Sequence, residues 1–172
     1  MSGLQIGESF IGDGVNAAHI NTVLGDRSGP AGTAWATALA TPSAGHVPFM
    51  AVLAPGVAVK PLTLFVSKAA VANEKHGNLL WGAAQAGVAG GVADAVADGA
   101  VDADAVDELA LIVAVWVNPE ADHADTVYRN NRTATRTALE NGKAGLPRAD
   151  DIAQYVARPT NPFYQAPEDG NP

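Results

Sequence analysis

The sequence contains no cysteine among its 172 residues. A disulfide framework, a thiolate-ligated zinc site, an iron–sulfur cluster and a cysteine nucleophile are therefore excluded. Charged residues are also scarce, at 16% of the chain, against roughly a quarter in an average soluble domain. Hydrophobic residues make up 48%, which is enough for a sizeable core. The composition thus excludes a disordered chain and favours one globular domain.

Basic residues are outnumbered, and this balance argues against a nucleic-acid partner. The formal net charge is −8, and a phosphate backbone would repel such a protein. The first residues contain no basic segment followed by an apolar run, so we expect no signal peptide. The longest uncharged apolar stretch, residues 77–93, falls short of the roughly 18–20 residues that a membrane span needs. We interpret it as part of a buried helix, with a membrane span as the alternative.

Hydrophobic periodicity divides the chain into strands and helices. Strands are expected at residues 4–11, 18–25, 47–53, 62–66 and 109–117. Helices are expected at residues 30–40, 73–97, 102–108 and 122–141, with Gly142 as the stop signal of the last. Residues 109–117 are apolar on both faces, which predicts a central strand. The pattern predicts a single α/β domain over residues 1–172, with residues 158–172 as an extended C-terminal tail.

The helix expected at residues 73–97 is rich in glycine. Each glycine inside a helix costs about 1 kcal/mol relative to alanine. The residues concerned are Gly77, Gly82, Gly87, Gly90 and Gly91. Such a run predicts that something packs very close to this helix, and it is either the backbone of a neighbouring element or a flat ligand.

Acidic and basic residues are segregated along the chain. Nine acidic residues and no lysine or arginine lie between Lys75 and Arg129, and six of the ten basic residues lie from Arg129 to Arg158. Arg129, Arg132 and Arg136 fall on one helix face. That face is either solvated or in contact with another subunit, or it is an anion site for a phosphate or carboxylate.

Few residues stand out as candidates for chemistry, and none belongs to a familiar nucleotide-binding, hydrolase or metalloprotease motif. The four histidines are scattered along the chain, so no metal site is expected. His19 follows a glycine-rich turn and shares a strand face with Asn21. Lys68 ends an apolar strand and Gln85 lies on the glycine-rich helix. Each of the three has a structural alternative: a histidine whose ring is hydrogen-bonded within the fold, a lysine on the surface, and a glutamine amide hydrogen-bonded to the backbone.

Seven short segments together resemble one known family. They are GESFIGDG at residues 7–14, AHIN at 18–21, AVLAPG at 51–56, KPLTL at 60–64, GAAQAGVA at 82–89, DAVADG at 94–99 and NPF at 161–163. In order and spacing they resemble the formaldehyde-activating enzyme family over about residues 5–165. The resemblance implies condensation of formaldehyde with tetrahydromethanopterin to methylene-tetrahydromethanopterin and water. It also implies an α+β sandwich resembling the ribosomal protein S5 domain 2-like fold, a cytoplasmic location, and a homopentamer with pterin sites between subunits.

The resemblance also assigns site residues. The catalytic histidine of the family falls on His19, and its pterin-contacting positions fall on Asn21, Met50, Lys68, Ala70 and Gln85. This sequence departs from the family at three of them, with Asn21 for aspartate, Ala70 for threonine and Met50 for leucine. The segment Asn118-Pro-Glu after the central strand also replaces His-Trp-Glu.

The chemistry of the family suits a histidine. Formaldehyde adds to a ring amine, and water leaves the resulting carbinolamine slowly unless its oxygen is protonated, which a group of ordinary pKa near 6.5 can do. We therefore predict a lyase with His19 as general acid and without a metal. Asn21 lacks the carboxylate, and Ala70 the hydroxyl, that the family has at these positions. The alternative is therefore a paralogue that binds formaldehyde, a pterin or another flat ligand without this catalysis. A purely structural pentamer is a third possibility.

Overall fold

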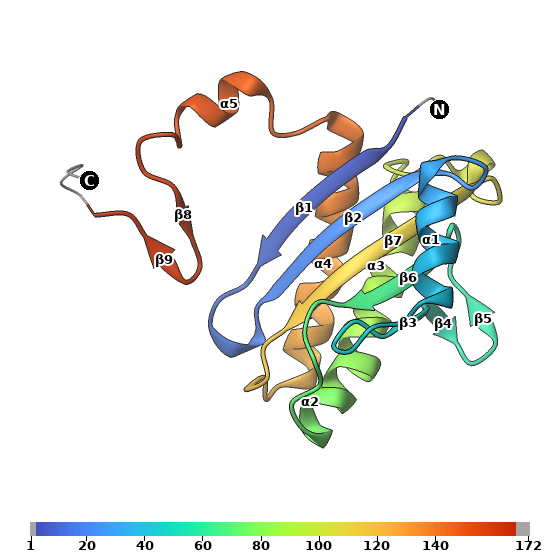
Figure 1. Cartoon of the computed structure of the whole chain (residues 1–172), viewed down its shortest axis with the longest axis horizontal. Helices are drawn as coiled ribbons and strands as arrows, with labels where there is room; N and C mark the ends of the chain where they lie inside the picture. Colours follow the sequence, from blue (N-terminus) through green and yellow to red (C-terminus); the bar gives the residue numbers. More distant parts are fainter. Residues whose placement is uncertain (1–2, 168–172) are drawn as a thin grey trace.

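The computed structural model describes residues 3–167 and is built around one mixed sheet. Its strands are β1 (Gln5–Ile11), β2 (Ala18–Asp26), β3 (Pro48–Met50), β6 (Leu62–Ser67) and β7 (Leu109–Val117), in the spatial order β1-β2-β7-β6-β3. Neighbouring strands are antiparallel except β6 and β7, which run parallel. The predicted α/β class and the central place of the 109–117 strand are confirmed (Figure 1).

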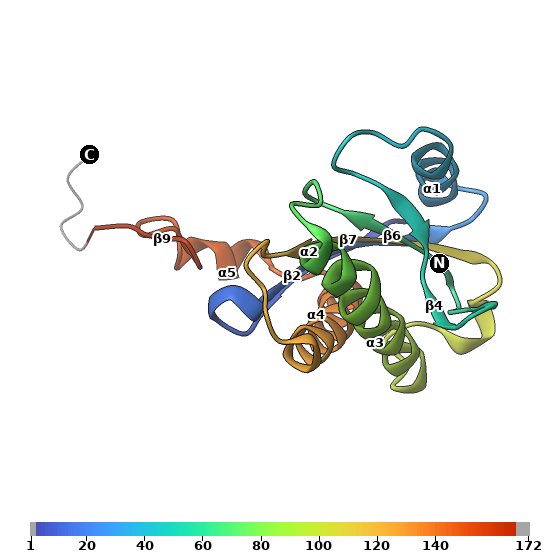
Figure 2. The same ribbon diagram turned by 90° about the horizontal axis from the view of Figure 1, so that it is seen from below.

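Helices cover the two faces of the sheet unequally. α3 (Gln85–Ala97) and α4 (Ala124–Ala144) pack side by side on one face, whereas α1 (Pro30–Ala40) lies alone on the other (Figure 2). A shorter helix, α2 (Glu74–Asn78), and a π-helical segment (Leu79–Ala84) run into α3. The remaining elements are the hairpin of β4 (Val52–Ala54) and β5 (Val57–Ala58), then α5 (Ala149–Ala153) and the hairpin of β8 (Thr160–Asn161) and β9 (Tyr164–Gln165). Within residues 3–167, none of the helices has the length and apolar character needed to span a bilayer.

The core lies between the sheet and the α3–α4 layer. Alternate residues of each strand enter it, as the period of two in a strand requires. Ile20, Phe65 and Val113 are fully buried there against Val88 and Val92 of α3. The other face of the sheet is covered by α1 at one end only, so its remaining part is free to hold polar side chains.

The glycines of α3 let it approach α4 closely. A Cβ atom on Gly87 would lie 2.5 Å from the carbonyl oxygen of Tyr128, and one on Gly91 would lie 2.4 Å from that of Arg132. For these two glycines, the neighbouring-backbone interpretation is confirmed. Gly82 differs, because a Cβ atom there would meet nothing within 4 Å.

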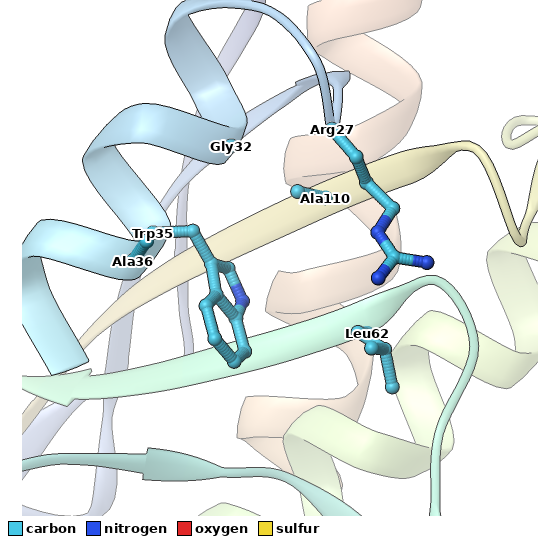
Figure 3. Close-up of a pocket in the computed structure, with 6 residues that line it drawn as sticks. All are labelled: Arg27, Gly32, Trp35, Ala36, Leu62 and Ala110. Atoms are coloured by element: carbon cyan, nitrogen blue, oxygen red, sulfur yellow. The ribbon is translucent and has the colours of Figure 1, made fainter.

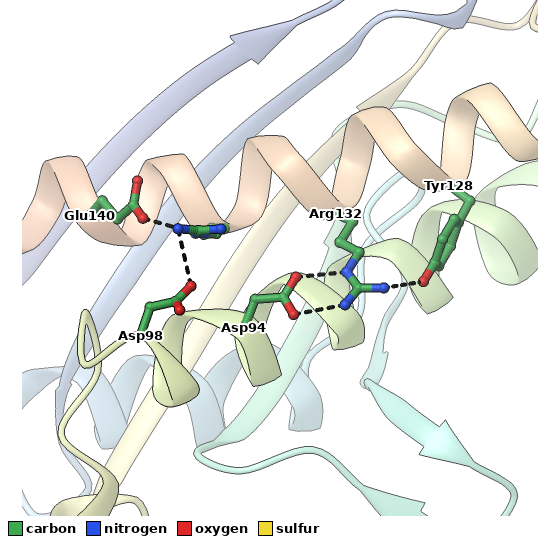
Figure 4. A network of polar contacts seen from close by, with 6 residues as sticks. Asp94, Asp98, Tyr128, Arg132 and Glu140 are labelled. Carbon is green, nitrogen blue, oxygen red and sulfur yellow. Dashed lines mark hydrogen bonds and ion pairs between the residues drawn. The ribbon is translucent and has the colours of Figure 1, made fainter.

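Two arginines of α4 are paired with carboxylates within the chain (Figure 4). Arg132 donates from Nε and Nη2 to the two carboxylate oxygens of Asp94, at 2.6 and 2.7 Å, and from Nη1 to the Tyr128 hydroxyl at 2.8 Å. Arg136 contacts Asp98 at 3.1 Å and Glu140 at 2.9 Å. The positive charges of Arg132 and Arg136 are thus neutralised by carboxylates of the same chain, which leaves little to support the anion-site alternative on this helix face.

The Asp94–Arg132 pair should contribute to stability in a pH-dependent way. The hydrogen bonds that Arg132 donates to Asp94 lower the pKa of Asp94 below the ordinary value of 3.8. The contribution is therefore complete above that value and is lost as pH falls through the lowered pKa. Asp94→Asn should reduce the free energy of unfolding at neutral pH by about 1 kcal/mol, because the pair is partly exposed. Urea unfolding would show this, with the exposed Glu120→Gln as control; an equal loss in both variants would contradict it.

Three expected elements differ in detail. The strand expected at 47–53 divides at Ala51, since β3 pairs with β6 while β4 turns back on β5 through the loop at Gly56. The prediction of a helix at 102–108 is wrong, because only a single 3-10 turn, Ala103–Ala105, forms there before the chain enters β7. The prediction that Gly142 ends α4 is also wrong. Gly142 makes a close approach to β1, and Gly145, in the left-handed conformation, caps the helix.

The chain after α4 leaves the main body. α5 precedes the expected tail, and within that tail the β8–β9 hairpin forms, since Thr160 and Asn161 pair back on Tyr164 and Gln165 (Figure 1). Residues 168–172 of the expected tail lie outside the described residues.

Candidate functional site

The part of the sheet left uncovered by α1 presents a cluster of ionisable side chains. Register places Glu8 of β1 opposite Asn21 of β2, and Phe10 opposite His19. On the other side of β2, His19 is opposite Trp116 of β7. Lys68 follows β6 and its backbone N–H donates to Val115 of β7. Because paired residues share a face, alternation alone brings Glu8, His19 and Lys68 to one surface.

The three groups form a short chain of contacts. The Nε2 atom of His19 lies 3.0 Å from a carboxylate oxygen of Glu8. The Nζ atom of Lys68 donates to the backbone carbonyl of His19 over 3.4 Å. The side chain of His19 is 37% exposed, so the imidazole is reachable from solvent while its backbone is fixed in the sheet.

The surroundings lower the pKa of both bases. Partial burial and the Lys68 ammonium lower the pKa of His19 from its ordinary 6.5, although the Glu8 carboxylate acts in the opposite direction. Burial lowers the pKa of Lys68 to about 8, again opposed by Glu8. His19 is therefore a stronger acid than a free imidazole, and Lys68 remains largely protonated at neutral pH.

The Glu8 carboxylate was not among the residues expected at this site. Asn21 was expected to leave His19 without a carboxylate, but Glu8 supplies one from the neighbouring strand. The signal was present in the sequence, since the alternation of residues 4–11 and the short turn to 18–25 fix which side chains of the hairpin share a face.

Two other expected residues, Met50 and Ala70, lie on other parts of the chain than His19. Met50 of β3 is opposite Leu64 of β6, three strands from β2, which is roughly 14 Å at ordinary strand spacing. Ala70, in the loop after β6, lines a small apolar hollow with Val47 and Trp81. A ligand touching His19, Met50 and Ala70 together would have to be elongated.

Gln85 belongs to the opposite layer. It begins α3, is 8% exposed, and donates from Nε2 to the carbonyl of Val52 over 2.8 Å. The backbone-bound alternative is confirmed for this amide. Within one chain, the sheet thus separates Gln85 from His19.

A hollow beside the cluster lies between the β1–β2 turn and the C-terminal hairpin. Its volume is about 590 Å³, and its walls are Phe10, Gly12, Asp13, Gly14, Val15, Asn118, Pro162 and Phe163. The ring of Phe10 lies 5.9 Å from that of His19, and Phe163 packs edge-on against Trp116 at 5.5 Å. This volume is within the range of small-molecule sites. In residues 3–167, no three acidic or histidine side chains are grouped to hold a metal ion.

Comparison with known proteins identifies the family. The family model described as formaldehyde-activating enzyme matches residues 6–164. The chain belongs to the formaldehyde-activating enzyme family. The match includes both Glu8 and His19 of the cluster as well as Pro162 and Phe163 at the hollow.

Several similar proteins are named bifunctional enzyme Fae/Hps. The bifunctional enzyme Fae/Hps of Methanothrix thermoacetophila is 38% identical over 157 residues, which cover 91% of this chain and 40% of that protein. The enzyme of that name from Methanocella arvoryzae is 40% identical over 148 residues, or 86% of this chain and 37% of that protein. The chain described here therefore spans about 40% of the length of such relatives.

Proposed function

We propose that this protein condenses formaldehyde with tetrahydromethanopterin, giving methylene-tetrahydromethanopterin and water, with His19 as general acid. The observation that carries the proposal is the position of His19, partly exposed between the Glu8 carboxylate and the Lys68 ammonium in a chain of the formaldehyde-activating enzyme family. Both reactants are small molecules, and the reaction is of the carbon–oxygen lyase type. The cytoplasm is the compartment we propose.

His19 would act on the oxygen that leaves. A ring amine of the pterin attacks the carbonyl carbon of formaldehyde and forms a carbinolamine. The imidazolium of His19 gives its proton to the carbinolamine hydroxyl, so that the C–O bond breaks and water departs. A second amine of the same substrate, outside the ring, then attacks the carbon atom that came from formaldehyde, closes the methylene bridge and releases a proton, which restores the charge balance. Glu8 favours the charged form of His19, and Lys68 makes that form more acidic.

A second copy of the chain would complete the pterin site. Gln85 lies in the helix layer, away from the His19 face, and the apolar residues Ile6, Val156 and Phe163 are 61%, 72% and 73% exposed. Exposed large apolar side chains are typical of subunit contacts. We propose a homopentamer in which one chain offers His19, Lys68 and Met50 and its neighbour offers Gln85. Light scattering should give five times the chain mass of 17.5 kDa; a monomer would contradict this arrangement.

Stopped-flow absorbance tests the activity. Formaldehyde and tetrahydromethanopterin react spontaneously, so the rate with protein is compared with the rate without it. We expect saturable acceleration proportional to protein concentration. A folded oligomer that gives no acceleration would contradict the proposal and favour the second candidate.

The second candidate is a protein that binds formaldehyde, a pterin or another flat ligand without catalysis. Ala70 favours it, because this residue offers only a methyl group beside Val47 and Trp81 in an apolar hollow. Equilibrium binding of a reduced pterin without acceleration of the condensation would be its signature.

The pKa of His19 should respond in opposite directions to its two neighbours. Glu8→Gln removes a charge and a hydrogen bond that raise the pKa of His19, so it should lower this pKa further. Lys68→Met removes a charge that lowers it, so it should raise the pKa of His19. NMR titration of the His19 ring proton would measure both, with Glu120→Gln as control. Shifts of the same sign in the two variants would contradict this electrostatic account.

A further inference from the structure

A second hollow lies under α1, at the far end of the sheet from His19. It is lined by Arg27, Gly32, Trp35, Ala36, Leu62 and Ala110, and its volume is about 250 Å³ (Figure 3). Arg27 directly follows β2, eight residues after His19, which corresponds to about 26 Å along a strand. The hollow is therefore separate from the Glu8–His19–Lys68 cluster.

Two hydrogen-bond donors at this hollow are incompletely used. The indole Nε1 atom of Trp35 is buried and has no hydrogen-bond partner among the described residues. A buried N–H group without a partner is costly, so such groups are rare. In Figure 3 the ring nitrogen of Trp35 lies on the side of the indole that faces the guanidinium of Arg27.

Arg27 is held in place by the backbone, and its charge is not neutralised by direct contact. Its Nη1 atom donates to the carbonyl oxygen of Asp107 over 2.8 Å, and its backbone N–H donates to Glu108. The carboxylate of Asp107 is itself paired with Lys60. Among residues 3–167, no carboxylate lies within ion-pair distance of Arg27. A positive charge with further N–H donors is thus available beside the Trp35 indole.

We propose that this hollow binds a small carboxylate with a short apolar body. A carboxylate offers one oxygen to the guanidinium of Arg27 and the other to the indole N–H of Trp35. The walls formed by Leu62, Ala36 and Ala110 suit a hydrocarbon body and would leave the extra oxygens of a phosphate without donors. The volume, below the roughly 300–1,000 Å³ of drug-sized sites, suits a ligand of only a few carbon atoms.

NMR locates the site, with sodium propionate as the probe. The indole N–H signal of Trp35 is assigned by its loss in Trp35→Phe. Propionate should move this signal saturably and leave those of Trp81 and Trp116 unchanged. Inorganic phosphate and sodium chloride at equal ionic strength should move it much less. A shift no larger than that produced by chloride, or a stronger response to phosphate, would overturn the proposal.

Calorimetry with matched variants tests the two donors. Arg27→Gln and Trp35→Phe should each raise the propionate Kd at least about tenfold, as expected for loss of a hydrogen bond to a charged group. Arg129→Gln, an exposed arginine of α4, should leave the Kd unchanged. Trp35→Phe keeps the apolar ring, so it decides the question if Arg27→Gln fails to fold. An unchanged propionate Kd in Trp35→Phe would overturn the proposal. A Trp35 indole signal that moves when only the protein concentration is changed would also overturn it, because a second copy of the chain would then cover the hollow.

Discussion

Replacing His19 with alanine should reduce the protein-dependent rate of formaldehyde condensation by about 10²–10⁴-fold, the usual contribution of a general acid. The variant keeps the strand pairing of β2, because His19 joins the sheet through its backbone and its side chain lies on the partly exposed face. Only the proton donor is removed. Stopped-flow absorbance measures the loss as the difference between the rates with and without the variant.

A second histidine provides the control. His123 is exposed at the start of α4 and accepts a hydrogen bond from the backbone N–H of Thr126. Asparagine is a good residue for this capping position, so His123→Asn should fold normally and keep the wild-type rate. If His19→Ala retains the wild-type rate, or if His123→Asn loses as much activity as His19→Ala, His19 is not the general acid.

Replacing Gly91 with alanine should destabilise the fold by about 1–3 kcal/mol, as overpacking of a tight interior does. The added Cβ atom would lie 2.4 Å from the carbonyl oxygen of Arg132 and 2.8 Å from the Cβ atom of Thr135, so α3 and α4 would have to separate. This cost exceeds the gain of about 1 kcal/mol that alanine has over glycine in a helix. A native stability of roughly 5–15 kcal/mol makes the loss easy to detect by urea unfolding.

Gly82→Ala is the matched control. It lies in the π-helical segment before α3, and a Cβ atom there would meet nothing within 4 Å. The same chemical change should therefore leave the stability equal or raise it by up to about 1 kcal/mol. Equal destabilisation by both variants would show that helix–helix approach is not the reason for glycine at position 91.

The strands were predictable because their sequence patterns are local. Alternation in 4–11 and 18–25 and the continuous apolar run of 109–117 depend only on which faces are buried, and the structure has β1, β2 and β7 at these places. The division at Ala51 was not predictable in this way, because it depends on Pro48–Met50 pairing with β6 while the next residues join a separate hairpin. The glycines show the same limit, since only the position of α4 decides which of them must lack a side chain.

The candidate site was predicted in part. His19 and Lys68 stood out by residue type and position, but the carboxylate beside His19 comes from another strand and depends on register. Gln85 shows why a set of residues assigned by resemblance need not meet within one chain, because the sheet lies between it and His19. Trp35 gave no signal in the sequence at all. Its importance arises from a single buried indole nitrogen that only tertiary packing leaves without a partner.

The pH dependence of kcat/KM for methylene-tetrahydromethanopterin formation, measured for the wild-type protein and for His19→Ala after subtraction of the spontaneous rate, tests the central claim most directly. For a general acid, kcat/KM follows the protonated fraction of the free protein. Because the pKa of His19 lies below its ordinary 6.5, the wild-type value should fall as pH rises through this lowered pKa, and the falling limb should vanish in His19→Ala. A wild-type value that rises with pH over the same interval, or an identical falling limb in His19→Ala, would contradict the role of His19 as the proton donor.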